Sequence, residues 1–178
     1  MLDKGTGELY IESIPVMLGP SFTRRALSST PVAAQSKVVN EPYHSYSLGQ
    51  QRIAGQLFFV GLCFYGQQLE CIDLAHAAAE FGTSWDDWSE ERELKLKQWH
   101  DDWLRGQTGY ASHVYKWGAI GSAYDPRSGS SSITIRYSWK GQAWPRVKPT
   151  VWRKLVTCVK QLLGRGETRR IGSFSVLG

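Results

Sequence analysis

The residues with the greatest potential for chemistry are three cysteines and four histidines. Nucleophilic catalysis would need one of these thiols beside a base. The thiol at position 63 falls inside the apolar run 57–65, where burial raises a thiol pKa and suppresses reactivity. The chain has no serine- or cysteine-hydrolase signature. We therefore predict no catalytic residue, and keep a thiol- or histidine-dependent hydrolase as the third alternative. The residues concerned are Cys63, Cys71, Cys158, His44, His76, His100 and His113.

Neither a metal nor an organic cofactor is predicted. The sequence has no pair of histidines at zinc spacing and no Cys-x-x-Cys pair. Asp125 opens the run Asp-Pro-Arg-Ser-Gly, which favours a turn that closes a hairpin over a calcium loop. The glycine-rich stretches near Gly5 and Gly118 match no phosphate-binding pattern.

The charge of the chain is divided between two regions of opposite sign. The whole carries +5, but residues 140–170 hold nine bases and one acid. This basic segment has three possible roles: packing on the body, binding nucleic acid through phosphate neutralisation, or lying on an anionic membrane surface. The body without it is net acidic. The candidate contacts for nucleic acid or a membrane are Arg153, Lys154, Lys160, Arg165, Arg169 and Arg170.

The clearest predicted helix carries most of the acids of the body. Residues 80–102 contain eight acids and three bases, and four tryptophans lie between Trp85 and Trp103. Core packing is favoured for the tryptophans, because an apolar sheet needs a cover. The acids are solvated or form a complement to a basic protein partner, since charge of one sign speeds encounter. The predicted partner contacts are Trp85, Asp86, Asp87, Glu90, Glu91, Glu93, Asp101 and Asp102.

The elements that must position these residues follow from periodicity and turn signals. Ser84 with Asp87 has the spacing of a capping box and predicts the helix start, and Gly106 or Gly109 its end. Apolar residues at helical spacing predict a second helix, basic and amphipathic, at about 150–163. Strands are predicted at 9–16, 44–48, 56–65, 69–74, 112–123 and 131–139, and a loop at 28–42 with a short helical turn at 23–27.

These elements predict an α+β fold with two parts. Residues 1–139 form the body, an antiparallel sheet of about five or six strands covered by the tryptophan-rich helix. Residues 140–178 form the basic tail that carries the second helix. Cys63 and Cys71 flank a predicted turn, so a cross-strand contact between them is possible. No signal peptide or membrane-spanning run is recognised, which predicts a cytoplasmic protein.

Two motifs resemble a known class of proteins. The run WGAIGSAYDPRSG at residues 117–129, with Ile133, Ile135 and Tyr137 after it, and the run SWDDWSEE at residues 84–91 are similar to small bacterial immunity proteins. Such proteins neutralise contact-delivered or type VI-secreted toxins. The resemblance covers about residues 8–137 and implies a non-enzymatic inhibitor that binds one cognate toxin.

The leading interpretation is thus an immunity protein that occludes the active site of its toxin. The first alternative is a nucleic-acid-binding module that uses the basic tail. The first interpretation places the binding residues on the acidic helix of the body, and the alternative places them on the basic tail.

Overall fold

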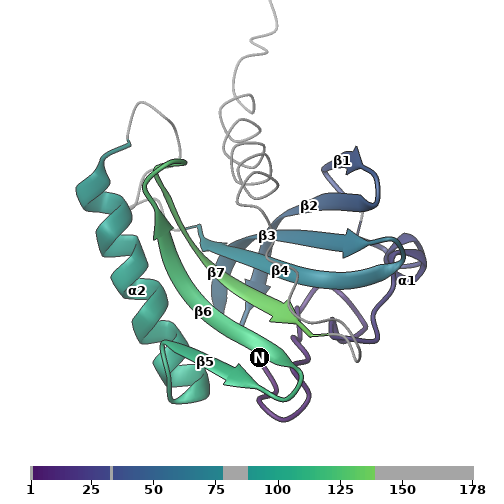
Figure 1. The fold of residues 1–178 in the computed structure, drawn as a ribbon, viewed down its shortest axis with the longest axis horizontal. Helices are drawn as coiled ribbons and strands as arrows, with labels where there is room; N and C mark the ends of the chain where they lie inside the picture. Colours follow the sequence, from purple (N-terminus) through teal and green to yellow (C-terminus); the bar gives the residue numbers. More distant parts are fainter. Residues whose placement is uncertain (1, 33, 78–87, 139–178) are drawn as a thin grey trace, which may run out of the picture.

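The computed structural model describes residues 2–32, 34–77 and 88–138, which form one antiparallel sheet with helices. Figure 1 shows the twisted sheet with the long helix α2 lying along it. The spatial order of the strands is β1-β2-β3-β4-β7-β6-β5. This confirms the predicted α+β class, but with seven strands instead of five or six. The elements are α1 (Arg24–Ser28), β1 (Ser36–Asn40), β2 (Tyr43–Ile53), β3 (Gln56–Tyr65), β4 (Gln68–His76), α2 (Glu90–Thr108), β5 (Ser112–Tyr115), β6 (Gly118–Asp125) and β7 (Ser130–Tyr137).

Two meanders make up the sheet, and α2 connects them in sequence. Strands β1 to β4 follow one another as neighbours, and β5 to β7 do the same. The meanders meet where β4 pairs with β7, with Ile72 opposite Ile135 and Leu74 opposite Ile133. All four of these side chains are fully buried. The junction therefore runs through the centre of the core.

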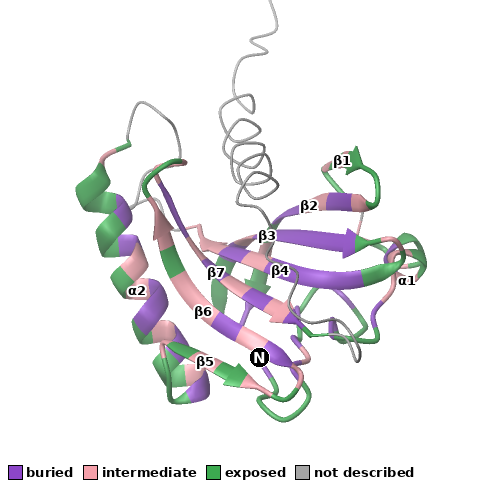
Figure 2. Cartoon of the chain, in the orientation of Figure 1, coloured by how far each residue is buried: buried purple, intermediate pink, exposed green. Residues whose placement is uncertain are grey.

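One face of the sheet carries the hydrophobic core. Side chains alternate along a strand, so Ile133, Ile135 and Tyr137 lie on the same side. On that side Phe58 contacts the rings of Trp99 and Trp103 from α2, with centroids 5.9 and 4.9 Å away. Trp99 and Trp103 thus cover the sheet as predicted. Trp88, which precedes the helix, is instead 41% exposed, and Trp85 lies outside the described residues. Figure 2 shows the buried residues of α2 on its sheet side.

The N-terminal segment, residues 2–22, covers the remainder of the same face. Its apolar residues join the core cluster that includes Ile133 and Ile135. The hydroxyl of Tyr137 donates to the carbonyl of Gly7 at 2.9 Å, and the indole N–H of Trp117 donates to the carbonyl of Lys4 at 2.8 Å. These contacts join the N-terminal segment to residues more than a hundred positions later in the sequence.

Several predicted boundaries were wrong. Residues 9–16 do not form a strand, and only Leu9 among them forms isolated bridges, to Leu2 and Leu18. Leu9, Ile11 and Ile14 are nevertheless buried, as their pattern suggested. The predicted loop 28–42 contains β1, whose residues are mostly exposed at the sheet edge and have no clear apolar alternation. The predicted strand at 112–123 is two strands, because a turn at Lys116 and Trp117 separates β5 from β6.

The structure begins α2 at a different cap from the predicted one. The hydroxyl of Ser89 accepts from the Arg92 N–H at 3.2 Å, so Ser89 is the N-cap and Glu90 the first helical residue. The predicted cap Ser84 lies outside the described residues. Gly109 ends the helix in the left-handed conformation, with φ of 88°, as one of the two predicted glycines.

Gly106 and Gly109 give a matched test of the helix end. A Cβ at either position would meet no atom within 4 Å, so only the backbone conformation distinguishes them. Gly106→Ala should stabilise the protein by about 0.5–1 kcal/mol, because alanine favours a helix interior. Gly109→Ala should destabilise it by about 1–2 kcal/mol, because a Cβ disfavours positive φ. Urea unfolding measures both, and changes of the same sign would contradict this helix end.

Candidate functional site

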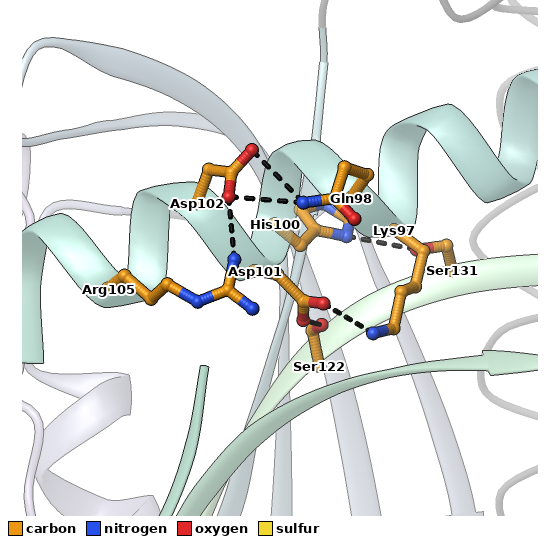
Figure 3. A network of polar contacts seen from close by, with 8 residues as sticks. All are labelled: Lys97, Gln98, His100, Asp101, Asp102, Arg105, Ser122 and Ser131. Carbon is orange, nitrogen blue, oxygen red and sulfur yellow. Dashed lines mark hydrogen bonds and ion pairs between the residues drawn. The ribbon is translucent and has the colours of Figure 1, made fainter. Parts of the chain in front are cut away.

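A polar network lies between α2 and the second meander (Figure 3). His100 is fully buried at its centre. Its Nε2 accepts from the backbone N–H of His76 at 3.1 Å, and its Nδ1 lies 3.0 Å from the Ser131 hydroxyl. Because Nε2 accepts, the proton of the neutral ring belongs on Nδ1, which donates to Ser131. Burial, with a smaller effect from His76, lowers the pKa of His100 to about 3.

Two of the acids predicted to contact a partner belong to this network. Glu93 is 6% exposed, and its carboxylate accepts from the Ser131 backbone N–H at 2.7 Å. Asp101 is 5% exposed and accepts from Lys97 and from the Ser122 hydroxyl. Burial acts to raise the pKa of Asp101, but these hydrogen bonds lower it below its usual value. Both carboxylates are buried and attach α2 to the sheet.

The other acids of α2 are exposed and have local partners. Glu90 accepts from the Tyr124 hydroxyl at 3.3 Å, Glu91 from Lys95 at 2.7 Å and Asp102 from Arg105 at 2.7 Å. Three bases of α2 are exposed alongside these three acids. The solvent side of α2 therefore has no net acidic charge. The remaining predicted contacts, Trp85, Asp86 and Asp87, lie outside the described residues.

The described cysteines are placed as structural thiols. Cys63 and Cys71 face each other across β3 and β4, as predicted, and both are buried and free. A hydrogen bond with Cys63, together with burial, raises the pKa of Cys71 well above its usual range. A thiol held in its protonated form is a poor nucleophile. The hydrolase alternative gains no support from this pair, and Cys158 lies outside the described residues.

The described ranges contain no group of three or more metal-ligating side chains. No helix among them is long and apolar enough to cross a membrane. The six basic residues considered for nucleic-acid or membrane contact, at positions 153–170, lie outside these ranges.

The sheet face opposite α2 holds a second group of polar residues, which the sequence analysis missed. Thr134 and Arg136 alternate with buried Ile133 and Ile135, so they lie on this face beside Asp73 of β4. The Thr134 hydroxyl donates to the Asp73 carboxylate at 3.0 Å. Burial raises the pKa of Asp73 to about 7. The signal in the sequence was a carboxylate within the apolar strand 69–74.

A shallow trough of about 400 Å³ runs over β5, β6 and β7 on this face. Its floor is made of small residues, including Ala119, Gly121 and Ser132, and Thr134 and Arg136 line the side toward β4. Small side chains leave the backbone accessible to a bound group. The trough therefore borders the carboxylate of Asp73, which Thr134 of its lining contacts.

His100 and Asp73 should give stability opposite dependences on pH. The folded-state pKa of His100 is about 3 against 6.5 ordinarily, so its contribution to stability is lost as pH falls below about 6.5. The folded-state pKa of Asp73 is about 7 against 3.8 ordinarily. The folded state therefore binds the Asp73 proton more tightly, and its contribution is lost as pH rises from about 4 to 7.

Single variants separate the two effects. Between about pH 4.5 and 6.5, Asp73→Asn should leave stability rising more steeply with pH than in the parent protein. His100→Gln should leave it rising less steeply or falling. Each slope should change by up to about 1.4 kcal/mol per pH unit. Urea unfolding across this window measures the slopes, and equal slopes in the two variants would contradict the assignment.

Comparisons with known proteins show the fold. No protein-family model matches the chain, and a search of the curated proteins gave no significant match. Among solved structures, the chain is similar to a chain of the complex described as Rhs1-CT in complex with cognate immunity protein RhsI1. The two are 15% identical, with a TM-score of 0.50 over 91% of this chain and 97% of that chain. The resemblance to immunity proteins found in the sequence is thus matched by a shared fold with a chain of an immunity-protein complex.

Proposed function

We propose that this chain is a non-enzymatic binding protein, an immunity protein that neutralises one cognate bacterial toxin in the cytoplasm by occluding its active site. The observation that carries the proposal is the shared fold with a chain of the Rhs1-CT and RhsI1 complex, over nearly the whole of both chains. The sequence motifs near residues 84–91 and 117–129 support the same class independently of the fold.

The placement of the reactive groups also supports a binding role. His100 has both ring nitrogens in hydrogen bonds and is kept neutral by burial. Cys71 keeps its proton, and Glu93 and Asp101 are bound to the sheet and to neighbouring side chains. A general base needs a free lone pair within reach of a substrate. His100, Glu93 and Asp101 are instead used to hold α2 on the sheet.

Co-expression tests the proposal directly. The full-length chain should restore growth to cells that express the toxin encoded beside its gene, and the two purified proteins should form a stable complex. The control is an unrelated toxin, against which the chain should give no protection, because immunity depends on one cognate interface. Continued growth arrest with the neighbouring toxin, despite folded chain in excess, would refute the proposal.

Occlusion makes a separate prediction about the inhibited toxin. If the chain covers the active site, inhibition should be stoichiometric, and a slowly processed substrate analogue should compete with the chain for the toxin. Enzyme assays at rising analogue concentration measure this competition. An inhibition constant that does not change with the analogue would leave immunity intact and contradict occlusion.

A cysteine variant separates binding from thiol catalysis. Cys71→Ala removes a buried thiol and adds no charge, so it should retain full stoichiometric neutralisation. The double variant with Cys63→Ala should retain it as well, provided that circular dichroism shows a folded chain. Loss of protection in the co-expression assay by a folded variant that still forms the complex with the toxin would revive the hydrolase alternative.

A further inference from the structure

The two faces of the sheet are covered differently. α2 and the N-terminal segment both lie on the face that carries Ile133 and Ile135. Among residues 2–32, 34–77 and 88–138, neither of these two covers lies over the opposite face. We refer to the part of this opposite face formed by β4, β6 and β7 as the open face.

Glu70 is an unusual residue of the open face. It is the extra residue of a β-bulge in β4, where the register changes between the pairs Cys63–Cys71 and Phe64–Leu69. Its side chain is electrostatically coupled to Arg136 and Tyr43, which places it on the open face. Only 9% of Glu70 is exposed, and its Oε2 has no hydrogen-bond partner among the described residues.

An unpaired buried carboxylate oxygen is costly, because it has lost water and gained no donor. Burial accordingly raises the pKa of Glu70, and Arg136 opposes this only in part. The same effect of burial acts on Asp73, which receives one hydrogen bond from Thr134. Two carboxyl groups of β4 therefore share the influence of one guanidinium group.

The groups around these carboxyls come from four strands. Arg136 and Thr134 are on β7, Cys71 lies on β4 between the two carboxyls, and Tyr43 and Cys63 come from β2 and β3. Arg136 is the cation among them. With both carboxyls ionised, two negative charges face the single positive charge of Arg136, so the group has a net negative charge. A positively charged donor would complete it.

The trough leads directly to this group. Thr134 and Arg136 line the trough and border Asp73 and Cys71 across the β4–β7 pairing. On the far side of the trough Val114 of β5 is 72% exposed. A chain segment lying in the trough would cover this apolar side chain at one end and reach the carboxyls at the other.

We propose that the open face binds a basic segment of the protein partner, with a lysine or arginine side chain seated between Glu70 and Asp73. This inference rests on the proposed function and names the surface that performs it. Charge complementarity carries it, because Oε2 of Glu70 lacks a donor within the described part of the chain, whereas the exposed acids of α2 already have partners. The backbone of the segment lies over the small residues of the trough.

The test uses the full chain and a tetra-arginine peptide, with a tetra-glutamate peptide as the control. Titration followed by backbone and carboxyl NMR should move the signals of β4, β6 and β7, and those of the Glu70 and Asp73 carboxyls most. The double variant Glu70→Gln with Asp73→Asn should weaken tetra-arginine binding at least tenfold. The matched double variant on α2, Glu90→Gln with Glu91→Gln, should change it less than twofold.

Three results would overturn the proposal. The first is the absence of tetra-arginine binding at millimolar concentration. The second is equal weakening by the α2 variant, which would move the site to the helix. The third is a response of residues 140–178 to the Glu70 and Asp73 substitutions without peptide binding, which would make the basic tail of the same chain the occupant.

The cognate toxin separates this inference from the proposed function. If the parent chain and the Glu70→Gln, Asp73→Asn variant protect cells equally, with the same toxin affinity, the open face is not the interface and the immunity function stands. If the parent chain binds tetra-arginine at the open face but protects against no toxin, the proposed function fails. A folded variant is verified by unchanged NMR signals for the core residues Ile135 and Leu104.

Discussion

The fold depends on the pairing of β4 with β7. Within the described residues, this ladder joins the two meanders into one sheet, and it places Ile72 and Leu74 against Ile135 and Ile133 at the centre of the core. It is also a non-local pairing, since about sixty residues separate the strands and α2 lies between them. The helix covers the second meander through its contacts with β6 and β7. The core face and the open face are thus the two sides of one junction.

Hydrogen bonds between polar groups help to fix α2 on the sheet. The tryptophan rings bury apolar surface, but apolar contacts are not directional. Hydrogen bonds to particular residues are directional, so they fix the position of the helix along the sheet. Ser131 makes two such bonds, because its hydroxyl accepts from His100 and its backbone N–H donates to Glu93. The Ser122 hydroxyl donates to Asp101. The charges that make the helix look like an interface in the sequence are therefore partly structural. The carboxylate that lacks a donor among the described residues, that of Glu70, lies on the opposite side of the sheet.

The sequence predicted the elements whose signal is local. The continuous apolar run of β3 and the strict alternation of β7 gave strands at the right positions, because each pattern reflects burial on two faces or on one. The orientation of the acids was harder to predict. Glu93, Leu96, His100 and Leu104 recur at spacings of three and four, which puts Glu93 in the apolar stripe. From its charge alone, Glu93 was expected on the solvent-exposed face of the helix. The open face depends on a bulge at Glu70 and on a pairing across the chain, and neither leaves a local signal.

The contacts of the N-terminal segment with Trp117 and Tyr137 affect when the core can form during translation. Lys4 and Gly7 leave the ribosome more than a hundred residues before their partners Trp117 and Tyr137, which are among the last described residues to appear. The apolar side chains of the N-terminal segment therefore stay exposed to solvent until β6 and β7 have been synthesised and have paired. The core therefore closes late and nearly all at once, after most of the chain has been translated. In a chain of this design the native core is present only after the sheet is complete.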